Sequence, residues 1–276
     1  MTQMDHLLAH PAFQAAIAPF FAALVVAAAL RRTQLIGLAV VCAFAVAVGL
    51  TMGYTFETFT AVRKLEVTGL GTPILIVALA LTRLHRNERV RLALDLALAA
   101  SVPWLLWRVL HQQEAANAML KGLASAAFAA LLLDAALRCG SDSIRSALTG
   151  LMLGLAVAVL AFLSASLVLG QWAVAVAAGS AAALLVLLAA PTTSQGAAGL
   201  ALPGAVICAL AALLAVFTGS LPWFCLLPLP AIPWATRLVP QDLERRWRTA
   251  SLSLLACLPA VALAVGLAWF AGSSST

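Results

Sequence analysis

Long apolar runs separated by short polar segments fill this chain from end to end. A helix that crosses the hydrocarbon core of a bilayer, about 30 Å thick, needs about 20 predominantly apolar residues. On that criterion the first half of the sequence predicts membrane-spanning helices at 12–30, 34–52, 66–84, 92–110 and 119–137. The second half predicts them at 146–169, 171–190, 198–217, 221–238 and 250–270. The expected fold class is therefore all-α, a polytopic transmembrane helix bundle of ten spans.

The span count is least constrained between residues 146 and 236, because this stretch contains no Lys, Arg, Asp, Glu or His. Its hairpins are placed by turn-forming residues alone, at Gly170-Gln171, at 191–196 (PTTSQG) and at 218–220 (TGS). Nine or eleven spans stay open as alternatives for the same reason.

Composition supports a membrane location and excludes a water-soluble domain. Of the 276 residues, 64% are hydrophobic and 9% are charged, whereas a soluble domain carries roughly 25% charged residues. Lipid tolerates apolar side chains on the outside of a fold, which water does not. The net charge of +6 does not indicate a nucleic-acid partner, because the basic residues fall in short clusters between apolar runs.

The basic residues predict the orientation of the chain, since loops rich in Lys and Arg stay on the cytoplasmic side. One side of the ten-span arrangement carries Arg31, Arg32, Arg83, Arg86, Arg89, Arg91, Arg138, Arg145, Arg237, Arg245, Arg246 and Arg248. The other side carries Arg63, Lys64, Arg108 and Lys121. The first side is therefore predicted to be cytoplasmic, with both chain ends on the outer side of a bacterial-type plasma (inner) membrane.

The sequence predicts one integral-membrane domain over 1–276, with a weaker signal for a five-plus-five division near 145. Residues 69–73 (GLGTP) would open the third span, and 199–203 (GLALP) would open the eighth. An odd repeat length would invert one half relative to the other, as in transporters that bind substrate near the midplane. The alternative is chance, because Pro is ordinary in a first helical turn.

Asp95 and Asp134 are the only acidic residues in the interior of the predicted spans, since Glu66 is the first residue of the span 66–84. Ionisable groups at membrane depth are costly and often functional, so both are candidates for coupling to a proton or a cation. Each also has an arginine four residues away on the cytoplasmic side, Arg91 for Asp95 and Arg138 for Asp134. The alternative is a structural ion pair on one helix face.

Arg63, Lys64 and Arg108 lie on the outer side, against the usual charge rule. If the third and fourth spans pack together, these residues converge on an anionic ligand, and the planar fork of arginine suits a carboxylate or a phosphate. His111 completes this predicted ligand-binding set. The alternative is that the basic side chains extend to the lipid headgroups and pair with the nearby acidic residues Glu57, Glu66 and Glu114.

The ninth predicted span, 221–238, contains four prolines, at 222, 228, 230 and 233. Each proline lacks the N–H donor of a regular helix, so this span cannot be helical throughout. At membrane depth the freed carbonyls need partners in the protein or in water. Pro228, Pro230 and Pro233 are therefore candidates for gating or for lining a cavity, and the alternative is a kinked packing element.

No motif in the sequence indicates a metal or a cofactor, and none is predicted. The five cysteines show no CxxC spacing, and the histidines are not paired at one depth for haem ligation. HExxH, GxSxG and P-loop motifs are absent from the sequence. An enzyme is therefore not favoured, although acid–base chemistry on a lipid headgroup through His111, Glu114 and Arg108 stays open as an alternative.

The short loops, the proline-rich ninth span and the outer basic residues favour a small-molecule permease or secondary transporter for an anionic or amphiphilic solute. A second alternative is a non-catalytic scaffold or assembly subunit of a larger membrane complex. Small residues in the second half, such as Gly150, Gly154, Gly179 and Ser180, would serve close helix packing within the chain or with a partner. The expected partners are the lipid bilayer, a small anionic solute, and a membrane protein or a second copy of this chain.

Overall fold

The computed structural model of the chain describes residues 10–54, 60–82, 88–139, 142–189, 197–219, 221–239 and 246–273. These residues form a helical bundle, and no strand occurs among them. In chain order the elements are η1 (Phe13–Ile17), α2 (Ala18–Leu30), α3 (Leu38–Thr51), α4 (Ala61–Thr82), α5 (Glu88–Leu110), α6 (Ala115–Arg138), α7 (Ser143–Leu163), α8 (Leu167–Ala189), α9 (Ala197–Thr218), η4 (Trp223–Leu226), α10 (Ala231–Leu238) and α11 (Arg246–Ser273). The all-α prediction is confirmed.

Seven helical segments of the described chain are long and apolar enough to cross a membrane. They are Phe13–Leu30, Glu88–Leu110, Ala115–Arg138, Ser143–Leu163, Leu167–Ala189, Gly199–Thr218 and Arg246–Ser273. Three of the ten predicted spans, 34–52, 66–84 and 221–238, are not among these segments. The chain is therefore a helical protein with several helices that could span a membrane. The structures of the three remaining predicted spans differ from one another.

The segment predicted as the span 34–52 forms a shorter helix. Turns occupy 34–37, and α3 holds 14 residues, which corresponds to a length of about 21 Å. The helix is apolar throughout. It is shorter than the hydrocarbon core, so the turn before it must lie close to the membrane surface if α3 crosses.

Helix α4 begins earlier than the predicted span at 66. Thr60 caps it, because the Thr60 hydroxyl accepts a hydrogen bond from the Arg63 backbone N–H at 3.3 Å. Arg63 and Lys64 therefore lie in the first turn of the helix and not before it. The sequence 69–73, expected to open a span, lies in the middle of α4 instead.

Pro73 leaves the carbonyl of Gly69 without its helical donor, and Thr72 compensates. The Thr72 hydroxyl donates to the Gly69 carbonyl oxygen at 2.7 Å, which is how Ser and Thr satisfy a proline-interrupted helix in lipid. In the other half of the chain, Pro203 lies in the second turn of α9. The two GLxxP-like segments thus occupy different positions in their helices.

The break between α7 and α8 does not lie at Gly170-Gln171, where the sequence predicts it. The chain turns at 164–166, where Ala165 adopts a left-handed backbone with φ of 60° and the Ser164 hydroxyl donates to Ala161 O. Gly170 lies inside α8, and any Cβ there would collide with the ring of Phe162. The glycine therefore serves packing between the two helices and not a turn. The predicted break at 191–196 lies outside the described residues.

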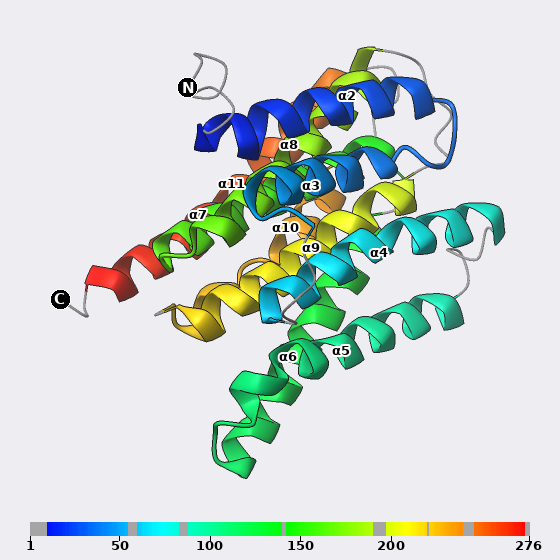
Figure 1. Cartoon of the computed structure of the whole chain (residues 1–276). Helices are drawn as coiled ribbons and strands as arrows, with labels where there is room; N and C mark the ends of the chain where they lie inside the picture. The colour runs from blue at the N-terminus through cyan, green and yellow to red at the C-terminus, as the bar shows by residue number, and fades with distance from the viewer. Residues whose placement is uncertain are drawn as a thin grey trace, which may run out of the picture.

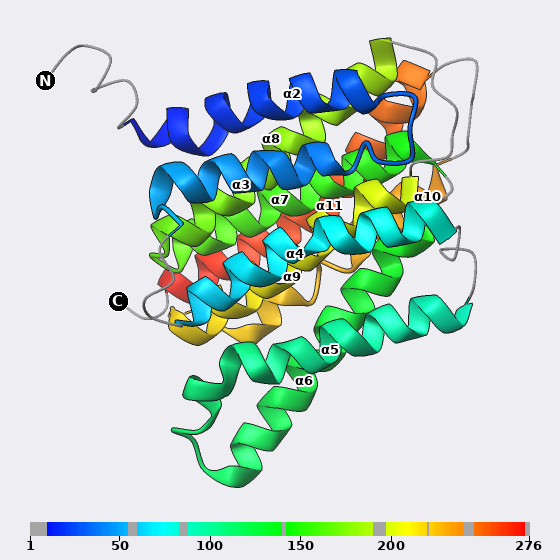
Figure 2. The same ribbon diagram turned by 45° about the vertical axis from the view of Figure 1, so that its right-hand side comes forward.

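Successive long helices run in opposite directions, so the ends of these helices lie on two sides of the bundle (Figures 1 and 2). We call one the terminal end, because η1 begins and α11 finishes there. The other is the basic end, where Arg31, Arg138 and Arg145 lie. Both ends of the described chain are on the same side of the bundle in both views.

The segment 221–239 carries the chain from the terminal end back to the basic end. Gly219 lies against Ser164, just after α7 ends, while the Val239 carbonyl accepts a hydrogen bond from Arg145 near the start of α7. Because α7 has 21 residues, the two contacts are separated by about 30 Å along its axis. The prediction that this segment is not one continuous helix is confirmed, since it comprises η4, further turns and the short α10.

Helices α7, α8 and α9 form the centre of the bundle, and small residues let them approach closely. A Cβ at Gly154 of α7 would lie 2.7 Å from the Ala177 backbone nitrogen and 2.9 Å from the Ala173 carbonyl oxygen of α8. A Cβ at Gly150 would lie 2.5 Å from the Ser180 hydroxyl. Without a hydrophobic driving force in lipid, such close contact is what holds helices together.

The replacement Gly154→Ala should destabilise the protein, because its Cβ meets backbone atoms that cannot move independently of α8. Overpacking of this kind costs about 1–3 kcal/mol, so the apparent Tm of detergent-purified protein should fall by several degrees. Gly266→Ala in α11 is the matched control, since nothing lies within 4 Å of its Cβ position. Equal Tm values for the two variants would contradict this packing.

Candidate functional site

The predicted outer basic residues all lie at the terminal end, but they face different partners. Lys64 donates to the carbonyl oxygen of Trp104 at 2.6 Å and lies 4.9 Å from the centroid of the Trp104 ring. Arg108, one turn further along α5, is exposed, as is His111, whose ring stacks on Trp107 at 5.7 Å. The structure therefore brings Lys64 to α5, one turn from Arg108.

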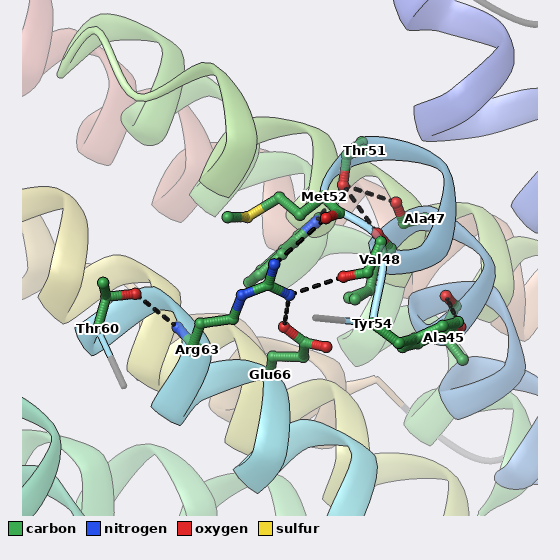
Figure 3. Close-up of polar contacts among 11 residues, drawn as sticks. Ala45, Ala47, Val48, Thr51, Met52, Tyr54, Thr60, Arg63 and Glu66 are labelled. Carbon is green, nitrogen blue, oxygen red and sulfur yellow. Dashed lines mark hydrogen bonds and ion pairs between the residues drawn. The ribbon is translucent and has the colours of Figure 1, made fainter. Parts of the chain in front are cut away.

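Arg63 points away from α5 and toward the end of α3 (Figure 3). Its Nη1 donates to the Gly53 carbonyl oxygen at 2.7 Å and to Glu66 Oε2 at 2.5 Å, and its Nη2 donates to the Met52 carbonyl oxygen at 3.2 Å. The side chain is nearly fully buried. Arg63 and Arg108 thus have separate surroundings, and the predicted pairing of Arg63 with Glu66 is present.

The end of α3 explains why an arginine is held at this position. The last carbonyls of a helix lack intrahelical donors and carry partial negative charge. Gly53, with φ of 65°, turns the chain out of the helix, which leaves the Met52 and Gly53 carbonyls directed at the guanidinium. A planar group with five N–H donors can satisfy both carbonyls and a carboxylate at once.

Glu66 is the fully buried acid of this cluster, with 0% of its surface exposed. Its Oε2 accepts from Arg63, whereas its Oε1 has no hydrogen-bond partner among the described residues. A buried ion pair rarely adds net stability over apolar side chains of similar size, because both charges must leave water. The pair therefore calls for an explanation other than stability.

Tyr54 covers the same end of α3. Its hydroxyl donates to the Ala45 carbonyl oxygen at 2.6 Å, and its ring lies on Gly49, where a Cβ would come within 3.1 Å of the ring. Burial, followed by the negative charge of Glu66 and the Cys42 thiol, raises the pKa of Tyr54. The phenol therefore stays protonated and keeps donating. We define the Arg63 cluster as Met52, Gly53, Tyr54, Arg63 and Glu66.

A second polar cluster surrounds α10 near the basic end. The predicted gating residues Pro228, Pro230 and Pro233 are all buried. These prolines remove the helical donors of the carbonyls four residues earlier. Each of those carbonyls accepts from the backbone N–H three residues further on instead: Phe224 from Leu227 at 3.2 Å, Leu226 from Leu229 at 3.0 Å, and Leu229 from Ile232 at 3.1 Å. The freed carbonyls are thus satisfied within the segment itself.

Side chains of α10 and of neighbouring segments also donate to the carbonyls of Ile232 and Pro233 in α10. Cys139, after α6, donates to Pro233 O at 3.0 Å, and Cys257 of α11 donates to Ile232 O at 3.6 Å. The Thr236 hydroxyl donates to the same Pro233 O at 2.8 Å. Burial raises the pKa of the Cys139 thiol despite its hydrogen bonds to hydroxyl groups, so it stays protonated and able to donate.

Two further residues tie α10 to α7. The hydroxyls of Thr149 and Thr236 lie 3.3 Å apart, and Arg145 donates to the Val239 carbonyl. Asp142 Oδ2 lies 3.6 Å from Arg145 Nε and so balances its charge. We define the α10 cluster as Cys139, Arg145, Thr149, Thr236 and Cys257.

The predicted coupling residues lie outside both clusters. Arg138 Nε lies 2.6 Å from Asp134 Oδ2, in the ion pair that their spacing indicated, and both side chains are partly exposed. Asp95 is partly buried on α5, and the side chain of Arg91 lies outside the described residues. A coupling role for Asp95 or Asp134 stays a prediction.

Sequence reasoning did not single out Glu66, Cys139, Thr149 or Thr236 as site residues. The spacing of Glu66, three residues after Arg63, was the available signal for that pair. The α10 cluster had none, because Cys139 and Thr236 are 97 positions apart in the sequence. These residues can be recognised as a cluster only in the folded structure, where α6, α7 and α10 are in contact.

Comparison with known proteins adds no assignment. No protein-family model, no curated protein and no solved structure matches the chain. The two clusters are therefore the basis for any statement on function.

Arg63→Met should lower stability strongly, because it leaves the Glu66 carboxylate buried without its cation. Breaking one side of a buried pair costs about 3–5 kcal/mol, measured as a lower apparent Tm in detergent. The double variant Arg63→Met/Glu66→Gln should recover part of the loss, since the charge is then gone. Arg108→Met is the control and should change little, and an equal loss in this control would contradict the described contacts.

Proposed function

We propose that the protein is a small-molecule permease or secondary transporter of a bacterial-type plasma membrane. In this proposal the chain crosses the membrane ten times, with α3, α4 and 221–238 as the additional crossings, and both chain ends lie outside. The alternating helix directions support it (Figure 2), as do the positions of Arg31, Arg138 and Arg145 where α2 and α6 end and α7 begins. Basic segments stay on the cytoplasmic side, so the basic end would face the cytoplasm.

The single observation that carries the proposal is the irregular segment 221–238, which packs on α7 and α11 through its buried prolines and Thr236 and exposes Trp223, Leu227 and Trp234 on its other side. Backbone that is not helical is tolerated at membrane depth only where protein or a water-filled cavity surrounds it. Transporters place such interrupted segments at their substrate sites, where free backbone groups and nearby polar side chains bind the solute. The hydroxyls of Thr149 and Thr236, beside the Pro233 carbonyl, offer polar groups of this kind.

The scaffold alternative loses its specific support when the small residues are located. Gly150 and Gly154 face α8, and a Cβ at Gly179 would lie 2.7 Å from the Cβ of Ala43 in α3. Ser180 lies against Gly150. These residues serve packing within the chain, so they are not available to a partner.

Acid–base chemistry on a lipid headgroup also gains nothing from the geometry. His111 stacks on Trp107, and Glu114 accepts from Asn117 at 3.5 Å. Within the described residues, no hydrogen bond or ion pair joins His111, Glu114 and Arg108. A transporter therefore fits the described contacts better than an enzyme.

The proposal predicts that water reaches the α10 cluster as the protein changes conformation. In a variant with the native cysteines replaced by Ala or Ser, Thr236→Cys should react with a small water-soluble methanethiosulfonate. Leu214→Cys in α9 should not react, although Thr236 and Leu214 are equally buried, at 0%. Mass spectrometry of reconstituted protein measures both. Equal protection of the two positions would contradict a permease.

A further inference from the structure

The exposed side of α5 changes from apolar to basic in its last turns. Helix α5 lies at the periphery of the bundle in both views (Figures 1 and 2), and its buried residues face away from this side, since α5 packs mainly on α6. The exposed residues recur at helical spacing and include Ala93, Leu96, Ala97, Ala100, Trp104, Trp107, Arg108 and His111. This side of α5 is therefore apolar along most of its length and carries its cation at the terminal end.

The basic part of this side lies at the end of a helix that is long enough to cross a membrane. Helix α5 runs from Glu88 to Leu110 and is one of the seven candidate spans. Its last two turns therefore lie at the depth of the lipid headgroups, on whichever face of the membrane they are. Tryptophan, lysine and arginine suit this depth, because their apolar parts stay among the lipid chains while their polar ends reach the headgroups.

Lys64 of α4 is held beside the base of the Arg108 side chain. Its ammonium donates to the Trp104 carbonyl oxygen at 2.6 Å. In a regular α-helix the same carbonyl accepts from the backbone N–H four residues later, which is that of Arg108. Long side chains on a helix lean back over the preceding turn, so we expect the guanidinium on the turn that carries Trp104. The two cations are thereby within reach of one anion.

Lys64 and Arg108 have no anionic partner within the described chain. Lys64 contacts a carbonyl oxygen and an aromatic ring, both of which are neutral. Arg108 makes no hydrogen bond or ion pair with any described residue. Glu66 is fully buried against another arginine, Glu114 accepts from an amide of α6, and Glu57 lies outside the described residues. Two neighbouring cations with neutral surroundings attract an anion, and phosphate suits both guanidinium and ammonium groups.

We propose that Lys64, Trp104 and Arg108 bind the phosphate of an anionic phospholipid, with one acyl chain of the lipid along the exposed side of α5. The guanidinium bonds two phosphate oxygens, and the ammonium bonds a third. The Trp104 ring holds the ammonium in place, since its centroid lies 4.9 Å from Lys64 Nζ. A zwitterionic lipid fits less well, because its own cation is repelled by the two basic side chains.

The apolar surface beside the cations favours a lipid over a soluble phosphate. Trp107 is 61% exposed and Leu96 is 60% exposed, and both lie on the path from headgroup depth toward the middle of α5. An acyl chain covers this surface, whereas a soluble anion contacts the cations alone. The inference is separate from the permease proposal, because it places no solute inside the bundle and requires neither ten spans nor a given orientation.

Native mass spectrometry of the detergent-purified protein tests the site, with phosphatidylglycerol as the probe. The first phosphatidylglycerol should bind with a lower Kd than phosphatidylcholine. Lys64→Met and Arg108→Met should each raise Kd for phosphatidylglycerol by at least about tenfold, because each removes a charge-assisted hydrogen bond to the phosphate. Arg31→Met is the matched control, since Arg31 is also an exposed arginine at the end of a candidate span, and it should leave this Kd unchanged. Size-exclusion profiles show that each variant is folded.

The double variant Lys64→Met/Arg108→Met separates one shared phosphate from a general attraction of charges. Side chains that hold the same group are coupled, whereas independent charges act additively. The double variant should therefore bind phosphatidylglycerol more tightly than the product of the two single losses predicts. Strictly additive losses, equal Kd values for the two lipids, or an unchanged Kd in the folded single variants would each overturn the proposal.

Competition with glycerol phosphate distinguishes a lipid from a soluble anion. This compound carries the phosphate without acyl chains, so a large excess should not displace phosphatidylglycerol from the wild type. Displacement that depends on Lys64 and Arg108 would show that the cations take a soluble phosphate, which would overturn the assignment to a lipid.

Discussion

Every backbone carbonyl at membrane depth needs a donor, and this requirement shapes the irregular parts of the bundle. Regular helices meet it internally, but prolines and helix ends do not. Thr72 donates to the carbonyl that Pro73 leaves free, and backbone N–H groups in tight turns donate to the carbonyls that Pro228, Pro230 and Pro233 leave free. At the end of α3, Arg63 donates to the Met52 and Gly53 carbonyls. The polar side chains of this protein are therefore concentrated where the backbone departs from the helix.

The two polar clusters differ in charge. The α10 cluster uses mainly thiols and hydroxyls, which satisfy carbonyls without bringing charge into the bundle. The Arg63 cluster uses a guanidinium, which in turn requires an anion. Glu66 provides that anion, and its remaining oxygen faces no described partner.

The sequence predicted what depends on local composition. Helix α6 and helix α11 lie close to their expected spans, and the irregularity of 221–238 followed from its prolines. It placed the start of α3 four residues too early, because Leu35 and Ile36 in the turns at 34–37 continue the apolar run. It misplaced the break before α8, since Gly170 resembles a turn residue but accommodates Phe162. For Arg63, the direction of the side chain depended on the end of α3, which no pattern in α4 reveals.

The central claim is that 221–238, packed on α7 and α11, crosses the membrane although it is not a continuous helix. Single cysteines at its two ends test this most directly, in a variant that lacks the native cysteines. Thr218 at the end of α9 and Leu238 at the end of α10 are both exposed. With a membrane-impermeant maleimide, Thr218→Cys should be labelled in intact cells, and Leu238→Cys only after the membrane is permeabilised. Labelling of both positions from the same side would contradict the account.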